Sequence, residues 1–174
     1  MVLKVANGFL LFHHRSEIYS NWYLRPITVK GIVFNCVEQL LMFAKARLFG
    51  DEFRAAEIMA TPDPAEQKAI GRKVDGFVEA VWVARREAIL LHALYAKFTQ
   101  HEDLKLQMIN TGDLEFVEAS GSDGVYGVKL WESNPRILDR RNWRGLNILG
   151  LALDSVRFKI VGEINAGIPH RRCA

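Results

Sequence analysis

The sequence predicts a mainly α-helical protein of the α+β class, with a small antiparallel sheet near its N-terminus. Between residues 36 and 110, apolar side chains recur at the three- and four-residue steps of amphipathic helices. Short apolar runs separated by turn residues, which are typical of strands, dominate residues 9–34. A chain of 174 residues suits one domain, so we expect a single domain over residues 1–174.

The composition is that of an ordinary globular chain, with 49% apolar and 25% charged residues. Lys and Arg exceed Asp and Glu by only 23 to 20, and this surplus is too small to predict a nucleic-acid partner. Cys36 and Cys173 form no C-x-x-C pair, the five histidines form no H-x-x-x-H pair, and no window approaches 18 uncharged apolar residues. We therefore expect a cytoplasmic protein with no membrane contact, no metal and no cofactor.

Two apolar runs near the N-terminus predict the sheet. Phe9–His13 is the first run, and Ile27–Phe34 is a longer run that Lys30 and Gly31 split. Such a split marks a tight turn between two short strands. We expect these runs to form one small antiparallel sheet.

The first helix is predicted by its cap residues. Asn35 has the character of an N-cap residue, and Glu38, three residues on, has that of the acid in a capping box. The helix should run over about residues 36–49, and Gly50 is placed to end it in a left-handed cap.

The later elements follow from similar start and stop signals, such as Asp63 followed by Pro64. The predicted helices cover about Asp51–Ala60, Asp63–Val74, Phe77–Gln100, Glu102–Asn110 and Asn147–Val161, and a strand covers Leu114–Ala119. The longest helix carries a ridge that we expect to face the core, made of Phe77, Val81, Ala84, Ala88, Leu91, Tyr95 and Phe98. Residues 120–146 form an irregular segment whose length favours a functional loop.

Glu38 and Lys45 are candidates for acid–base or nucleophilic chemistry. They are seven residues apart, so they lie within about 20° on one helix face and about 10.5 Å apart along its axis. A capping Glu and a solvated Lys would give the same pattern. The alternative is that a cleft brings both charges toward one ligand, where partial burial shifts both pKa values.

The long loop holds further candidates. Asp123 precedes a glycine and Tyr126 follows it closely, an arrangement that suits close approach to a ligand or a simple Asp-Gly turn with a packed ring. Four arginines surround Trp143 between residues 136 and 144, which suits phosphates and a stacked base or a solvated turn. Asn147, at the predicted helix start, would cap that helix or help to bind an anion such as phosphate there.

Several segments follow one another in the order and spacing of a known family. They are 19–22 (YSNW), 29–39 (VKGIVFNCVEQ), 42–51 (MFAKARLFGD), 70–74 (IGRKV), the helix from Trp82 to Lys97 and Phe98, 114–127, and 140–150 (RRNWRGLNILG). In this order they resemble the NADAR (YbiA-like) family over residues 9–161. The resemblance implies an α-dominated, orthogonal helical bundle with a core over about 9–161 and a tail over 162–174.

The resemblance also implies an N-glycosidase that cleaves a ribosyl carbon–nitrogen bond without a cofactor. YbiA-like members hydrolyse phosphoribosylamino-pyrimidine intermediates of riboflavin synthesis, and other members remove ADP-ribose from guanine bases. The implied partner is thus a small ribosyl or ADP-ribosyl substrate, or an ADP-ribosylated nucleic acid. Catalytic roles fall on Glu38, Lys45 and Asp123, and substrate-binding roles on Ser20, Asn21, Arg72, Trp82, Tyr126 and Asn147. Many relatives have Trp at the position of Tyr126, which bears on substrate preference.

The sequence leaves two mechanisms and two rival functions open. Glu38 or Asp123 would stabilise oxocarbenium-like charge or activate water, or Lys45 would attack the anomeric carbon and form a Schiff base. Either mechanism requires these three groups to share one cavity, with Arg72 available to hold phosphate. The rivals are a non-catalytic module that binds ADP-ribose or a nucleotide, and a duplex DNA binder, which the lack of a basic helix disfavours.

Overall fold

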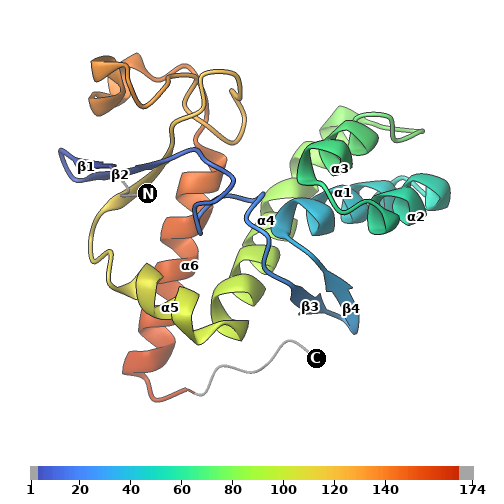
Figure 1. Ribbon diagram of the computed structural model, residues 1–174, viewed down its shortest axis with the longest axis horizontal. Coiled ribbons are helices and arrows are strands. Elements are labelled where there is room, and N and C mark those ends of the chain that lie inside the picture. The colour runs from blue at the N-terminus through green and yellow to red at the C-terminus, as the bar shows by residue number, and fades with distance from the viewer. Residues whose placement is uncertain (1–3, 169–174) are drawn as a thin grey trace. The chain divides into compact units, whose positions relative to one another are not determined.

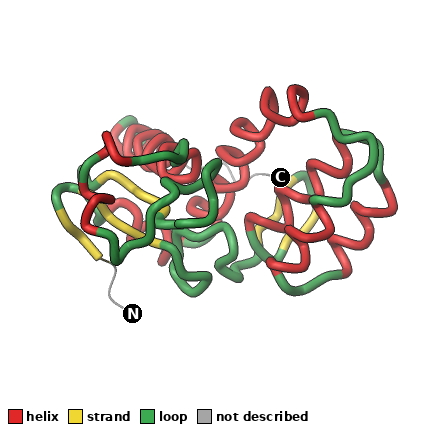
Figure 2. The backbone as a smooth tube through the Cα atoms, turned by 90° about the horizontal axis from the view of Figure 1, so that it is seen from above, coloured by secondary structure: helices red, strands yellow, loops and turns green. Residues whose placement is uncertain are grey.

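The computed structural model describes residues 4–168, which form two compact units (Figure 1). One unit is residues 21–101, and the other combines residues 4–20 with residues 102–168. Helices dominate and the strands are few and short (Figure 2), which confirms the predicted mainly α-helical class with a small sheet. No helix within residues 4–168 combines the length and apolar character needed to cross a membrane. The single domain and the orthogonal crossing of helices stay predictions, and Cys173 lies outside the described residues.

The unit of residues 21–101 contains a hairpin followed by four helices. Its elements are β3 (Ile27–Val29), β4 (Ile32–Phe34), α1 (Val37–Leu48), α2 (Glu52–Ala60), α3 (Pro64–Gly71) and α4 (Glu79–Gln100). Lys30 and Gly31 have φ angles of 50° and 75° and form the turn between the strands, because a two-residue hairpin needs left-handed central residues. The predicted split of this apolar run is confirmed.

Local cap signals also place the next helices. The backbone N–H of Arg54 donates to Asp51 Oδ1 at 3.0 Å at the start of α2. Asp63 plays the same role for α3 by accepting from the Ala65 N–H at 2.7 Å. Gly50, with φ 75°, follows the end of α1 in the predicted left-handed conformation.

The predicted cap of α1 is wrong. The N-cap residue is Cys36, and its side chain makes no capping hydrogen bond. Gln39, rather than Glu38, reaches back along the chain, because its Oε1 accepts from the Asn35 N–H at 2.7 Å. The side chain of Asn35 donates instead to Pro62 O at 2.9 Å. Glu38 is buried.

The predicted core ridge of α4 is correct only near its C-terminal end. Phe98 is buried, whereas Phe77, Val81 and Leu91 are exposed. The buried side chains of this helix are Trp82, Leu90, Ala93, Leu94, Ala96, Lys97 and Phe98. Most of the first half of α4 is exposed, because it is the second half that packs against the rest of this unit.

The other unit is built on a three-stranded sheet. Its elements are β1 (Lys4–Ala6), β2 (Phe9–Phe12), α5 (Glu102–Ile109), β5 (Glu115–Glu118), two short 3₁₀ helices (Pro135–Leu138 and Arg140–Asn142) and α6 (Ile148–Asn165). The strand order is β1-β2-β5, and β2 runs parallel to β5 with Leu10 opposite Phe116. The expected single N-terminal antiparallel sheet is therefore wrong, since β3 and β4 form a separate hairpin and β2 takes a distant parallel partner. The last helix continues to Asn165 and not only to the expected Val161.

Both faces of β2 are buried, which fits an uninterrupted apolar strand. One face joins a cluster of Phe9, Leu11, Val117, Ala119, Val128 and Ile137. On this face the Trp143 ring packs against Phe9, with ring centres 5.6 Å apart. On the other face Tyr19 lies 5.9 Å from Phe12 and 4.7 Å from Phe116, between ring centres. The long loop thus packs onto the sheet through Val128, Ile137 and Trp143.

Candidate functional site

Lys45 lies in the last turn of α1 in a buried niche within the unit of residues 21–101. Its side chain is only 9% exposed, and its Nζ donates to the backbone carbonyl of Gly71 at 2.7 Å. The Nζ atom also lies 4.1 Å from the ring centre of Phe77 and 6.0 Å from that of Trp82. No carboxylate among the described residues forms an ion pair with Lys45. A buried lysine without a counter-ion is unusual for a purely structural position.

The surroundings of Lys45 favour its neutral form. Burial lowers the pKa of Lys45 below its ordinary value, and the positive charge of Arg72, the residue that ends α3, lowers it further. A lowered pKa increases the fraction of neutral amine at neutral pH, and the neutral amine is the nucleophilic form. The predicted alternative of a solvated surface lysine is therefore wrong.

Gly71 allows α3 to approach α1 closely enough to reach this amine. A Cβ atom added to Gly71 would lie 2.2 Å from Met42 Sδ and 2.9 Å from Met42 Cγ, so any larger residue would require the Met42 side chain to move. The close approach brings the Gly71 carbonyl within hydrogen-bond distance of Lys45.

Glu38 and Asn21 lie together at the start of α1. The Glu38 side chain is only 4% exposed, and its backbone N–H donates to the Asn21 carbonyl at 3.0 Å. Asn21 is 5% exposed, and its side-chain Oδ1 accepts no hydrogen bond from the part of the chain that the structure describes. Buried polar atoms in proteins nearly always have partners, so this oxygen is suited to a donor on a ligand.

A second buried lysine, Lys97, lies in the last turn of α4. It is 1% exposed, and its Nζ lies 5.2 Å from the ring centre of Tyr23 and 5.5 Å from that of Phe98. Burial lowers the pKa of Lys97 to about 7, although the nearby Cys36 opposes this change. Burial also raises the pKa of the Cys36 thiol to about 11.

Replacing Lys97 by Met should stabilise the protein at pH 6 and flatten the pH dependence of its stability up to pH 9. In the wild type the unfolded lysine has a pKa of 10.5 and the folded one a pKa of about 7, so the unfolded state binds more protons in between. The free energy of unfolding of the wild type therefore rises with pH from about 7 upward. A methionine does not titrate, so the variant lacks this contribution. Above pH 9 the raised pKa of Cys36 acts in the opposite direction, which sets the upper limit of the test.

Urea unfolding of the two proteins between pH 6 and 9 measures this difference, with the exposed Lys73→Met as a control. If the free energies of unfolding of wild type and Lys97→Met changed in parallel between pH 6 and 9, Lys97 would not be a buried titrating amine.

Asp123 and Tyr126 lie in the other unit, within the long loop. One carboxylate oxygen of Asp123, Oδ1, accepts from the N–H groups of Val125 and Tyr126, both at 2.9 Å. The Asp123 N–H donates to Ser120 Oγ at 3.2 Å. This is the hydrogen-bonded turn that Asp-Gly sequences commonly form, and it fixes the Asp123 carboxylate and the backbone at Tyr126.

Asn147 neither caps α6 with its side chain nor leaves that helix terminus open. Its side chain accepts from the Glu118 N–H at 3.0 Å and donates to Phe116 O at 2.9 Å, which fastens it to β5. The N–H groups of Ile148 and Leu149 donate to loop carbonyls at 3.2 Å each. These amides are therefore not available to a phosphate, so the expected anion site at this terminus is wrong.

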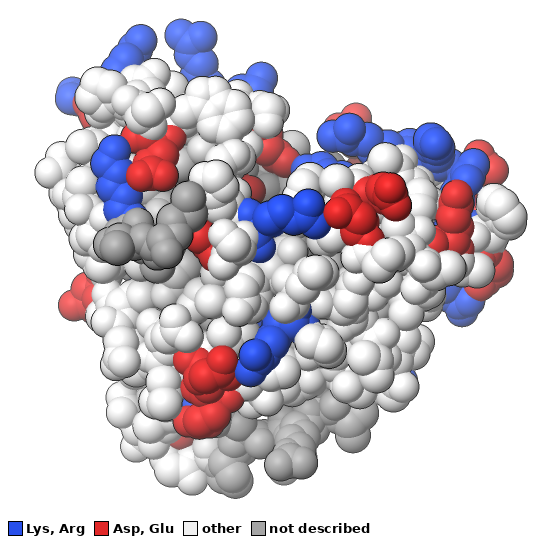
Figure 3. All heavy atoms as spheres, viewed as in Figure 1, with Lys and Arg blue, Asp and Glu red and all other residues white. Residues whose placement is uncertain are grey.

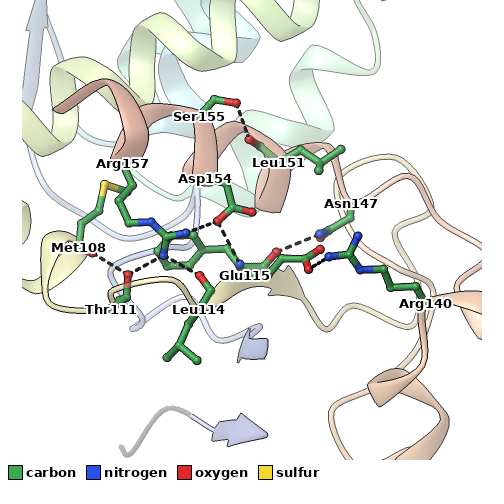
Figure 4. Close-up of polar contacts among 11 residues, drawn as sticks. Met108, Thr111, Leu114, Glu115, Arg140, Asn147, Leu151, Asp154, Ser155 and Arg157 are labelled. Carbon is green, nitrogen blue, oxygen red and sulfur yellow. Dashed lines mark hydrogen bonds and ion pairs between the residues drawn. The ribbon is translucent and has the colours of Figure 1, made fainter. Parts of the chain in front are cut away.

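The same strand is held to α6 by the polar contacts drawn in Figure 4. Arg157 donates to Thr111 Oγ1 at 2.7 Å and to Leu114 O at 2.6 Å, and it pairs with Asp154 at 2.7 Å. Burial raises the pKa of Asp154 to about 6 despite this positive neighbour. Asn147 and Arg157 thus both anchor β5, which suits a structural role.

The arginine-rich segment is largely engaged within the protein. Arg140 pairs with Glu115, and Arg141 pairs with Asp139 at 2.7 Å. Trp143 donates through Nε1 to Ile137 O at 2.7 Å, so its ring belongs to the packed loop. On the face shown in Figure 3, basic and acidic side chains are interspersed. These contacts favour the solvated-turn interpretation over a base-stacking surface.

The predicted site residues thus divide between the two units. Asn21, Glu38, Lys45, Arg72 and Trp82 belong to the unit of residues 21–101, whereas Ser20, Asp123, Tyr126 and Asn147 belong to the other. Within residues 4–168, no three His, Cys, Asp or Glu side chains are placed to hold a metal ion.

Sequence reasoning missed two neighbours of Lys45. Gly71 is part of a segment that resembles the family, but nothing in the sequence shows that its carbonyl binds an amine. Phe77 is the first residue of the apolar ridge predicted for the long helix, so the sequence suggested a core position. In the structure its ring lies over the Lys45 amine instead.

The fold and the sequence together define the class of protein. The family model of the NADAR domain matches residues 8–161, and the chain belongs to this family. The NMR structure of the E. coli protein YbiA has the same fold, with a TM-score of 0.76 and 24% identity over 97% of this chain and 94% of that one.

Three relatives match the chain in sequence over most of their length. Protein irg-1 of Caenorhabditis elegans is 33% identical over 86% of this chain and 78% of its own length. The protein named N-glycosidase R617, of Acanthamoeba polyphaga mimivirus, is 31% identical over 87% of this chain and 96% of its own length. N-glycosidase YbiA of Escherichia coli is 27% identical over 87% of this chain and 88% of its own.

Proposed function

We propose that this NADAR-domain hydrolase of N-glycosyl compounds cleaves the ribosyl carbon–nitrogen bond of a phosphoribosylamino-pyrimidine intermediate of riboflavin synthesis or of an ADP-ribosylated guanine base. The observation that carries the proposal is the buried Lys45 amine, which has no carboxylate partner and lies on the same helix as the buried Glu38. The relatives named N-glycosidases support the reaction type.

Lys45 is the nucleophile in this proposal. Its neutral amine attacks the anomeric carbon, and the bond from that carbon to the base nitrogen breaks with its electron pair moving to the base. The base gains a proton and leaves. The sugar ring then opens to give a Schiff base with Lys45, and water hydrolyses it to the free sugar and the amine. The lowered pKa of Lys45 favours the first step.

Glu38 stabilises the positive charge that develops on the sugar as the bond breaks. Such charge is best stabilised by a carboxylate fixed in a site from which water is excluded, and Glu38 is fixed by its buried position on α1. Asn21 Oδ1 accepts a hydrogen bond from the substrate, Trp82 stacks on the base, and Arg72 pairs with phosphate. Ser20, Asp123 and Tyr126 belong to the other unit, and their roles in catalysis or binding stay predictions.

Chromatography of the reaction with each of the two substrates tests the function. We expect release of the free pyrimidine or of free guanine from one of them, catalysed by the wild-type protein. Tight binding in calorimetry with no product from either substrate would instead favour the rival function, a non-catalytic ADP-ribose or nucleotide module. Salt-sensitive binding to unmodified duplex DNA would favour the DNA binder.

A further inference from the structure

Phe77 covers the Lys45 amine. Its ring centre lies 4.1 Å from Lys45 Nζ, in the segment between α3 and α4. The ring of Phe49 supports it from another side, with ring centres 5.3 Å apart and an interplanar angle of 67°. Phe77 is 43% exposed, whereas Lys45 is only 9% exposed. The ring therefore faces solvent while it shields the amine beneath it.

We infer that Phe77 is a positioning residue that sets the reactivity of Lys45 by separating its amine from water. The inference deepens the proposed function and rests on it, because it concerns the nucleophile of that reaction. Phe77 is not part of the buried core, since much of its ring is exposed, and its ring contacts the amine and Phe49.

A phenyl ring acts on a nearby amine in two opposite ways. It excludes water, which disfavours the charged ammonium, and its π face attracts the ammonium. Burial is the larger cause of the lowered pKa of Lys45, and the charge of Arg72 is the smaller one. The ring contributes to this burial, because it lies 4.1 Å from the amine. The other groups that face the amine are Arg72 and the Gly71 carbonyl at the end of α3 and the uncharged Trp82 on α4, while α1 itself carries Glu38 two turns earlier.

These opposite effects allow two substitutions to be distinguished. Phe77→Ala removes both the cover and the π face, so water reaches the amine and the pKa of Lys45 should rise toward its ordinary value. Phe77→Leu keeps an apolar cover but removes the π attraction, so the pKa should stay the same or fall. A residue that only supports the fold would shift the pKa upward in both variants, because any loosening of the niche hydrates the amine.

The experiment measures how fast Lys45 reacts with an acylating reagent as a function of pH. The folded protein is treated with the reagent and then digested, and mass spectrometry measures the acylation of the peptide that contains Lys45. The midpoint of the rate against pH reports the pKa of the amine and does not depend on how easily the reagent enters. Phe53→Ala is the matched control, since Phe53 is an exposed phenylalanine in the same unit that lies beneath Arg54 instead of Lys45. Thermal melts verify that each variant is folded.

We expect the midpoint to move up in Phe77→Ala, to stay or move down in Phe77→Leu, and to be unchanged in Phe53→Ala. Equal upward movement in both Phe77 variants, or none in either, would overturn the inference. No substrate is present in this experiment, so its failure is distinguishable from a failure of the proposed function, which would appear as absent turnover in the wild type.

Discussion

Replacing Glu38 by Gln should lower kcat at least a hundredfold and leave the fold intact. Gln has nearly the same size and shape, so the buried position on α1 stays filled. It removes the negative charge that faces the developing positive charge on the sugar, and a hundredfold loss corresponds to about 2.7 kcal/mol of transition-state stabilisation. Initial rates of base release measure the loss, and circular dichroism with thermal melts measures the fold.

The matched control is Glu66→Gln, because Glu66 is also a first-turn glutamate but lies exposed on α3. Its kcat should stay within about twofold of the wild type, as expected for an exposed charge with no catalytic part. If Glu38→Gln kept both its fold and its activity, Glu38 would have a structural role only.

Replacing Lys45 by Met should reduce turnover at least a thousandfold, because methionine cannot form a bond to the anomeric carbon. The fold should be retained or even stabilised, since an apolar side chain of similar length replaces a buried amine that has no counter-ion. Lys73→Met is the control, an exposed lysine in the same unit. Rates of base release and thermal melts are the measurements.

Lys45→Arg separates nucleophilic from electrostatic roles. Arginine keeps the positive charge but stays protonated at any pH at which the protein is folded, so it cannot act as a nucleophile. We expect it to be as inactive as Lys45→Met. If Lys45→Arg retained more than about a tenth of wild-type kcat, a loss of under about 1.4 kcal/mol, the amine would act through its charge alone.

The parts of the fold that could be predicted from the sequence depend on local signals. The hairpin turn at Lys30 and Gly31, the caps Asp51 and Asp63 and the stop at Gly50 each require only a few neighbouring residues. The parallel pairing of β2 with β5 joins strands that are about a hundred residues apart, and no turn or cap residue encodes it. The sheet was therefore predicted in the wrong form.

For the candidate site, too, the local spacing could be predicted from the sequence, whereas the contacts with distant segments could not. Helical spacing places Glu38 and Lys45 on one face of α1, but burial decides between a solvated pair and a reactive one, and burial depends on neighbouring helices. The Gly71 carbonyl and the Phe77 ring reach Lys45 from segments 26 and 32 residues away, which the α1 sequence does not contain. For Asp123 the local signal was sufficient, since the Asp-Gly turn is present.

Borohydride trapping tests the central claim, that Lys45 bonds to the sugar during turnover. Wild-type protein is mixed with the substrate that it cleaves and with borohydride, which reduces a Schiff base to a stable amine, and the protein is then digested and analysed by mass spectrometry. We expect a sugar adduct on the peptide that contains Lys45 and none on the peptide that contains Lys97. Full turnover with no adduct on Lys45 would contradict the account and leave water, activated by a carboxylate, as the nucleophile.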